Sequence, residues 1–125
     1  MRLLLDTHIF LWTVMNSPSL KPPARRLMEG ADQIYVSAAS IWEIAIKARL
    51  GKIEADESEL VEAIAASGFR ELPVRATHAA GVAKLPLHHT DPFDRLLIAQ
   101  AMAEPLKLLT VDTVLAQYSD LVMLA

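Results

Sequence analysis

The sequence predicts an α/β fold in which helices cover both faces of a mostly parallel sheet. Short apolar runs typical of buried strands alternate along the chain with longer segments typical of helices. No linker, internal repeat or low-complexity segment interrupts this alternation, and 53% of the 125 residues are hydrophobic. That content is enough for one well-buried core, so residues 1–125 are expected to form a single domain.

The first three elements are delimited by turn signals. Residues 2–5 are a short apolar run expected to form a buried strand, and residues 7–15 continue as an apolar helix that the segment 16–18, Asn-Ser-Pro, breaks. Pro22-Pro23 is typical of a helix start, and Gly30 ends the helix that follows.

A second strand and a strong helix follow. Residues 33–36 are expected to form the strand, and either Ser37 or Ser40 can cap the helix that runs through Leu50 before Gly51 ends it.

The remaining elements show the same alternation. Asp56 with Glu59 resembles a capping box, and Asp91-Pro92 is a favourable helix start. The expected elements are helices over residues 56–67, 77–84, 91–104 and 113–118 and strands over residues 69–72, 107–111 and 121–124.

The composition excludes several classes of protein. Without cysteine, neither a disulfide framework nor a thiolate metal site is possible. No run reaches the roughly 18 apolar residues of a membrane span, so we expect a soluble, cytoplasmic protein without membrane contact. The net charge of −3 argues against coating nucleic acid over a broad surface, but it leaves a metal-dependent nuclease open.

Four carboxylates are candidates for one metal site. Asp6 and Asp112 directly follow the first and last strong apolar runs, where sites form in open parallel sheets. Glu43 and Asp94 lie in apolar helical stretches, where an unpaired carboxylate is costly to bury. Because two carboxylates about 4 Å apart repel by ~4 kcal/mol at an effective dielectric of 20, four together require raised pKa values or cations. The pattern therefore indicates a Mg²⁺ or Mn²⁺ site and phosphate chemistry.

Structural alternatives exist for these acids. Asp6 and Asp112 can each serve as the N-cap of the helix that follows. Glu43 can pair with Lys47, four residues on, although an exposed pair would contribute only ~0.3–0.5 kcal/mol. Of the two aspartates at residues 91 and 94, Asp91 is the better cap and Asp94 the better ligand, since Asp94 shares the inward face of its helix.

Other polar residues have smaller expected roles. Thr110 offers a hydroxyl that can orient a carboxylate or a metal-bound water. His88 and His89 are adjacent in a loop and are expected to diverge, and the histidine spacing does not fit a zinc site.

Four segments resemble a PIN domain and, more narrowly, the VapC toxins of bacterial type II toxin–antitoxin modules. The resemblance covers nearly the whole chain, with the segments in the expected order. They are Leu4-Leu5-Asp6-Thr7-His8, Trp42-Glu43-Ile44, Asp91-Pro92-Phe93-Asp94-Arg95 and Leu109-Thr110-Val111-Asp112.

The resemblance implies a three-layer α/β/α sandwich and a Mg²⁺- or Mn²⁺-dependent endoribonuclease. By position, Asp6, Glu43, Asp94 and Asp112 match the acidic quartet of the family. It also implies a homodimer and inhibition by a small VapB-type antitoxin, which often places a basic residue in the acidic pocket. DNA contact would belong to the antitoxin. Val111 is a mild departure, because many members carry a basic residue before the last aspartate.

Four residues beside the acids, Thr7, Asp91, Arg95 and Thr110, are predicted to support the ligands or to position substrate. Arg95 is the favoured phosphate contact, with the cations at residues 47, 49 and 52 as a second candidate group.

Three alternatives to the ribonuclease remain at this point. The first is a catalytically weak PIN-like protein that only binds a partner. The second is an aspartyl phosphatase. Such an enzyme usually has a second aspartate two positions after the first, where this chain has His8. The third is a DNA 5′-nuclease, whose additional strand-threading elements need more length than 125 residues provide.

Overall fold

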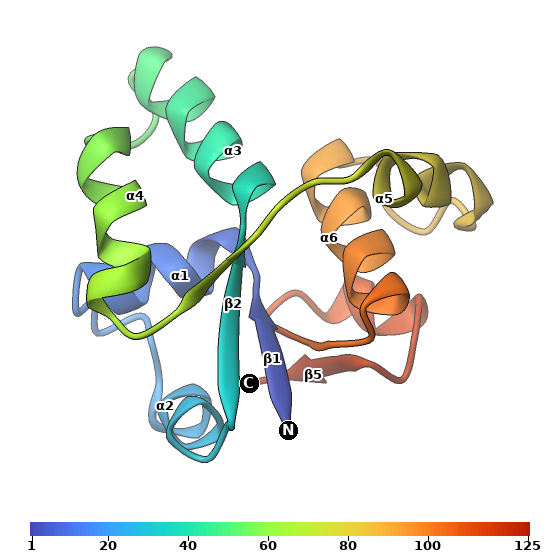
Figure 1. Ribbon diagram of the computed structural model, residues 1–125, viewed down its shortest axis with the longest axis horizontal. Coiled ribbons are helices and arrows are strands. Elements are labelled where there is room, and N and C mark those ends of the chain that lie inside the picture. The colour runs from blue at the N-terminus through green and yellow to red at the C-terminus, as the bar shows by residue number, and fades with distance from the viewer.

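The computed structural model describes all residues from 1 to 125, and its centre is a five-stranded sheet (Figure 1). Every neighbouring pair of strands is parallel, so the sheet is more uniform than the predicted mostly parallel one. The order across the sheet is β3-β2-β1-β4-β5. The strands are β1 (Arg2–Leu5), β2 (Gln33–Ser37), β3 (Arg70–Leu72), β4 (Lys107–Thr110) and β5 (Val122–Leu124).

Six α-helices and two 3₁₀ helices connect these strands, close to the predicted ranges. They are α1 (Thr7–Val14), α2 (Pro22–Glu29), α3 (Ala38–Arg49), α4 (Glu57–Ala66), α5 (Ala76–Gly81), η1 (Val82–Lys84), α6 (Pro92–Ala103) and η2 (Thr113–Gln117). Two details differ from the prediction. The helix expected over residues 77–84 divides into α5 and η1, and the helix expected over residues 113–118 is a 3₁₀ helix.

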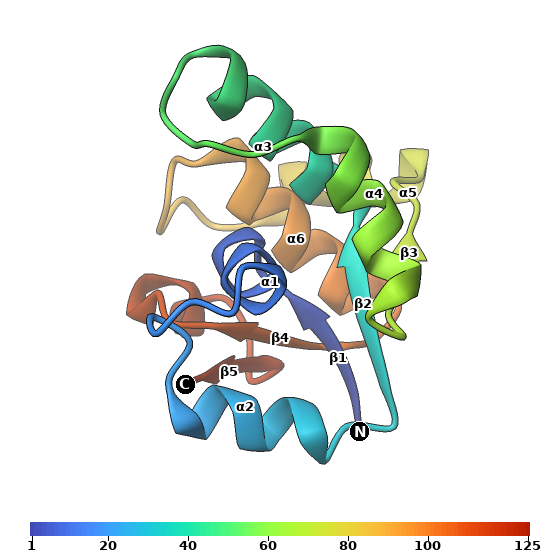
Figure 2. The ribbon, with the colours of Figure 1, turned by 90° about the vertical axis from the view of Figure 1, so that its left-hand side faces the viewer.

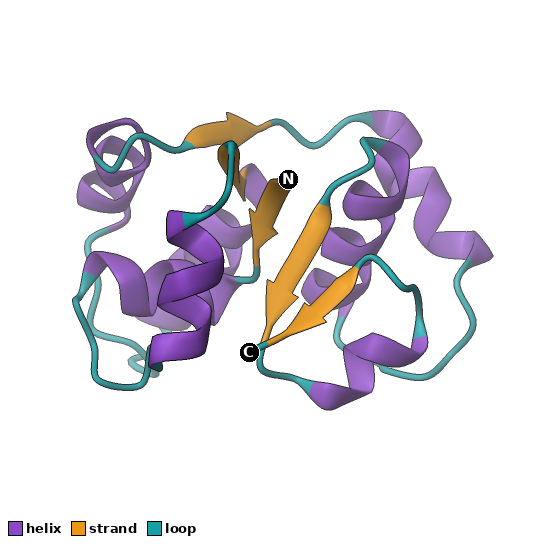
Figure 3. Ribbon diagram, turned by 90° about the horizontal axis from the view of Figure 1, so that it is seen from below, coloured by secondary structure: helices purple, strands orange, loops and turns teal.

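The alternation of side chains along the strands builds two cores. Leu3, Leu5 and Val36 point to one face and pack with residues of α1, α2, α3 and α4. Leu4 and Leu108 point to the other face and pack with residues of α6 and η2. Helices therefore cover both faces of the sheet, which confirms the three-layer α/β/α prediction (Figure 3).

Side-chain caps begin several of the helices. Ser37, one of the two predicted alternatives, caps α3 by accepting the backbone N–H of Ala39. Asp91 caps α6 as predicted and accepts the N–H groups of Phe93 and Asp94. These caps fix where each helix leaves the sheet. No helix is both long and apolar enough to cross a membrane.

The parallel strands all end at the same edge of the sheet. Asp6 follows β1, Asp112 lies two residues after β4, and α3 begins directly after β2. Figure 2 shows α2 near the N-terminus, at the opposite end of the sheet from α3. The strand ends therefore lie on the side of the molecule from which α1 and α3 depart.

Candidate metal centre

Asp6 is a buried carboxylate that accepts two hydrogen bonds. Its Oδ1 accepts the N–H of Ile9 at 2.9 Å, so the predicted capping role is present. Its Oδ2 accepts the hydroxyl of Thr110 at 2.5 Å, which joins the ends of β1 and β4 and gives Thr110 the orienting contact expected of it. Burial raises the pKa of Asp6, and the nearby Glu43 raises it further, although both hydrogen bonds act in the opposite direction.

Glu43 lies in the middle of α3 and is only 3% exposed. Its Oε1 accepts the hydroxyl of Thr7 at 2.7 Å, and its Oε2 accepts from Lys47 at 2.6 Å. The ion pair considered from the sequence therefore exists, but one partner is buried. The hydrogen bond to Glu43 is the main reason why the pKa of Lys47 is raised. Thr7 thus orients a carboxylate of the site, as a supporting residue would.

The surroundings of Asp94 also disfavour its ionised form. It lies in the first turn of α6 with its side chain 21% exposed. Burial raises the pKa of Asp94 to about 6, and the negative charges of Asp91, Asp6 and Glu43 contribute in the same direction. These effects on Asp94 mean that the fold brings Asp6, at the end of β1, and Glu43, on α3, into the electrostatic neighbourhood of α6.

Asp112 is the most exposed member of the set, at 38%. Its Oδ1 accepts the N–H of Val114 and caps η2, the alternative that the sequence left open. Its Oδ2 lies 3.5 Å from Nε2 of His89, and the same nitrogen lies 3.0 Å from Oδ2 of Asp94. Ligand atoms of His89, Asp94 and Asp112 all lie within 4.8 Å of one another.

Sequence reasoning did not assign His89 to the site. Its loop position between η1 and α6 gives no periodicity from which a side-chain direction follows. His88 and His89 do diverge as expected, because the ring of His88 packs edge-on against Tyr118 instead. A histidine three residues before the capped helix turn was the only available signal, and it does not specify a contact.

Arg95 has a different environment from the one predicted. Its guanidinium donates to the carbonyls of Pro86, Val82 and Leu85 and to the hydroxyl of Tyr118, at 3.0 to 3.4 Å. These contacts hold the loop between η1 and α6. In this structure Arg95 is therefore a loop-organising residue, and its contact with phosphate stays a prediction.

The donor set fits a hard divalent cation. Asp6, Glu43, Asp94 and Asp112 carry carboxylate oxygens, the ligand type that Mg²⁺ and Mn²⁺ prefer. The group with ligand atoms within 4.8 Å of one another consists of His89, Asp94 and Asp112 and does not include Asp6 or Glu43, so the full set of four stays a prediction. The raised pKa values of Asp6 and Asp94 show that their negative charge is poorly compensated by the protein. Of these four acids, only Glu43 forms an ion pair with a lysine or arginine, and its partner is Lys47. A dication would supply the missing positive charge.

A comparison with protein-family models matches residues 3–121 to the PIN domain. The chain belongs to the PIN-domain family. The resemblance noted in the sequence is thereby confirmed at the level of the family. A comparison by sequence with curated proteins found no match.

Solved structures with a similar fold include toxin–antitoxin complexes. The chain aligns over 100% of its length with 98% of a chain of VapBC2 from Rickettsia felis bound to a promoter DNA fragment, with a TM-score of 0.70 and 16% identity. A toxin–antitoxin complex from Klebsiella pneumoniae matches with a TM-score of 0.68 and 20% identity, covering 96% of this chain and 94% of that one. FitAcB from Neisseria gonorrhoeae matches with a TM-score of 0.66 and 19% identity, covering 97% and 96%. At these identities the likeness shows that this PIN domain shares their fold.

Proposed function

We propose that this PIN domain is a metal-dependent endoribonuclease that hydrolyses RNA phosphodiester bonds with Mg²⁺ or Mn²⁺. We further propose that it is the toxin of a VapBC-type pair. The observation that carries the proposal is the gathering of acids in which burial and neighbouring negative charges raise the pKa values of Asp6 and Asp94. A protein keeps such a costly arrangement where it binds a cation or performs chemistry.

The proposed ligands are Asp6, Glu43, Asp94 and Asp112. When bound, the cation would supply an activated water and would stabilise the leaving oxygen of the phosphodiester. The chain's own supporting groups already hold two of the acids in place. Thr110 donates to Asp6, and Thr7 donates to Glu43, so both carboxylates are oriented before any ligand arrives.

The proposed RNA contact must come from a local basic group, because the net charge of the chain is −3. Lys47 and Arg49 lie in the last turn of α3, and Lys52 follows it. Since α3 also carries Glu43, this group lies on the same helix as a proposed ligand and suits the backbone of a bound RNA.

The proposed partner is a VapB-type antitoxin. Three solved structures with a similar fold are VapBC2, a toxin–antitoxin complex from Klebsiella pneumoniae and FitAcB. An acidic pocket short of positive charge suits a basic side chain from such a partner. In this proposal any contact with DNA is indirect and belongs to the antitoxin.

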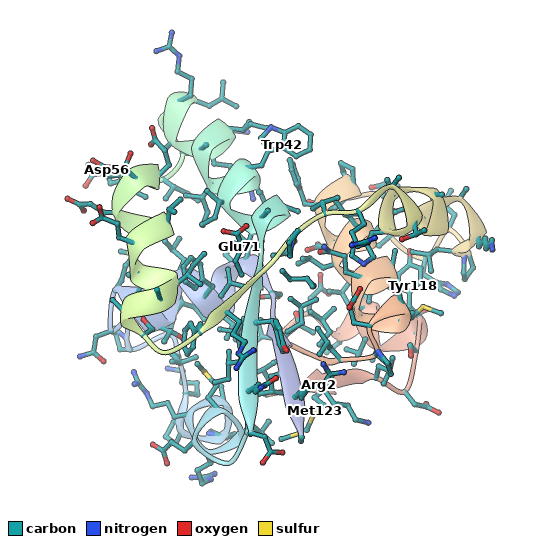
Figure 4. All side chains as sticks on the ribbon, viewed as in Figure 1. Arg2, Trp42, Asp56, Glu71, Tyr118 and Met123 are labelled. Carbon is teal, nitrogen blue, oxygen red and sulfur yellow. The ribbon has the colours of Figure 1, made fainter.

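A homodimer is also part of the proposal. Trp42 is 60% exposed, and it stacks edge-on against Phe93 with ring centroids 5.1 Å apart. Figure 4 shows Trp42 on the side of α3 nearer to α6. An apolar pocket of about 260 Å³ adjoins this pair and is also lined by Val82 and Leu96. Exposed apolar surface of this kind is typical of an interface, and a second copy would cover it.

The deciding experiment uses the chain purified free of any antitoxin. Incubation with total RNA is expected to give cleavage with Mg²⁺ or Mn²⁺ and none with a chelator. Asp6→Asn and Asp94→Asn are each expected to lower the rate at least 100-fold, because each removes a ligand charge. Asp120→Asn is the matched control, since Asp120 is exposed on the surface.

Two outcomes would reject the ribonuclease. Cleavage that persists in chelator or in both variants would place the activity elsewhere. Intact RNA under all conditions, combined with tight binding to a small companion protein, would favour the catalytically weak partner-binding protein.

A further inference from the structure

The geometry points to His89 as a positioning residue that donates through Nε2–H to Asp94, with Asp112 close beside it, and so holds the Asp94 carboxylate ready for a cation. The inference deepens the proposed function, because it assigns a supporting role at the same site. It concerns a residue that the acidic quartet does not include. Nε2 lies 3.0 Å from Oδ2 of Asp94 and 3.5 Å from Oδ2 of Asp112.

The contact of the other ring nitrogen determines which nitrogen of the imidazole carries the hydrogen. Nδ1 of His89 accepts the backbone N–H of Thr90 at 3.1 Å, so Nδ1 carries no hydrogen. In the neutral ring the hydrogen then resides on Nε2, which faces the two carboxylates. A nitrogen that carries a hydrogen has no free lone pair for a metal. His89 therefore acts on the ligands and is not itself a ligand.

The backbone of His89 is held on two sides. Its N–H donates to the hydroxyl of Tyr118 at 2.8 Å, and its carbonyl accepts from the same hydroxyl at 3.3 Å. Arg95 donates to the Tyr118 hydroxyl at 3.2 Å and to the His89 carbonyl at 3.4 Å. These contacts explain why a loop residue can present its ring in one direction. They also show that Arg95, by facing the loop, helps to hold the backbone of His89.

One oxygen of Asp94 remains available in this arrangement. His89 contacts Oδ2 of Asp94, which leaves Oδ1 without a protein donor. The donor thus fixes the rotation of the carboxyl group while leaving an oxygen for a cation. Groups that orient ligands in this way typically change metal affinity by about 10- to 100-fold when they are removed.

The test compares two substitutions that differ in reach. The amide nitrogen of His89→Gln can occupy the place of Nε2 and donate to Asp94, whereas the shorter His89→Asn can mimic only Nδ1. His88→Asn is the matched control, because His88 is exposed and its ring contacts Tyr118 and no acid of the site. Mn²⁺ affinity is measured by electron paramagnetic resonance of the free ion and by calorimetry. The ring nitrogens of the wild-type protein are observed by ¹⁵N nuclear magnetic resonance.

We expect His89→Asn to weaken Mn²⁺ binding about 10-fold or more, and His89→Gln to restore it to within about threefold of wild type. His88→Asn should bind as wild type does. The spectra should show hydrogen on Nε2 and none on Nδ1. Tyr118→Phe should weaken binding in the same direction as His89→Asn, because it frees the His89 backbone.

Three results would overturn the inference. They are unchanged Mn²⁺ affinity in a folded His89→Asn, equal weakening by the Gln and Asn variants, and a magnetic coupling that shows Nε2 bound to Mn²⁺. If the Asn variant does not fold, the ¹⁵N spectra and the Tyr118→Phe variant still decide. These results are independent of the proposed ribonuclease activity, because none of these measurements involves RNA. A wild-type chain that binds Mn²⁺ but does not cut RNA would reject only the activity.

Discussion

The raised pKa of Asp94 predicts that its ionised form destabilises the metal-free protein. Burial and three neighbouring acids raise the pKa from 3.8 to about 6. Since each pKa unit corresponds to 1.36 kcal/mol, keeping Asp94 ionised costs about 3 kcal/mol of folding free energy at pH 8. Asp94→Asn removes that charge, and the Asn carbonyl can still accept the Nε2–H of His89. The variant should therefore be more stable than wild type at pH 8.

The effect has a definite pH dependence. The folded state binds the Asp94 proton more tightly than the unfolded state, so wild-type stability falls as the pH rises from about 4 to about 6 and this contribution then levels off. The advantage of Asp94→Asn should be about 3 kcal/mol at pH 8, about half of that at pH 5, and close to zero below the unfolded pKa of Asp94. At pH 8 the expected rise in Tm is on the order of 10 °C.

Calorimetry and chemical denaturation over pH 4.5 to 8, with chelator present, measure this effect. Asp120→Asn should show no such pH-dependent gain, because Asp120 is exposed. Saturating Mn²⁺ should reduce the advantage of Asp94→Asn, since the wild type gains more from the cation. A variant that is less stable than wild type at pH 8, or a gain that does not change with pH, would refute the electrostatic explanation.

Two further predictions concern α3. Lys47→Met should lower the free energy of unfolding by about 2 kcal/mol in chelator, because the buried Glu43 loses the cation that lies 2.6 Å away. Mn²⁺ should restore most of the loss. An unchanged Tm in chelator would contradict this prediction. Trp42→Glu should convert the proposed dimer to a monomer by light scattering while leaving the thermal unfolding of each protomer cooperative, because the substitution puts a charge into exposed apolar surface. A wild-type chain that is already monomeric at high concentration would reject the dimer.

Much of the fold was predictable because local signals and burial agree. The apolar runs at residues 2–5 and 107–111 belong to the strands β1 and β4, and Asp91-Pro92 begins α6 as its capping chemistry requires. The splitting of the helix near residues 77–84 was not predictable from local pattern. There α5 gives way to the 3₁₀ helix η1, whose carbonyl at Val82 accepts from Arg95 across the fold.

The candidate site was predictable in its acids and in the two threonines that donate to them. A carboxylate at a strand end or inside an apolar helix is unusual enough to be noticed in a sequence, and Asp6 and Glu43 are indeed buried. Contacts made by loop side chains depend on tertiary geometry instead. The sequence therefore gave no indication that His89 faces Asp94, or that Arg95 turns towards the loop carbonyls.

The central position of β1 has a consequence for the order in which the chain can mature. β1, which comes before the other four strands in the sequence, pairs with β2 on one side and with β4, in the last part of residues 1–125, on the other. Asp6 receives its Thr110 hydrogen bond only when that last part of the chain is available. A nascent chain would thus hold Asp6 without this hydrogen bond until β4 has been synthesised. The proposed hydrolytic activity, which needs Asp6 in this geometry, can therefore arise only after β4 has joined the sheet.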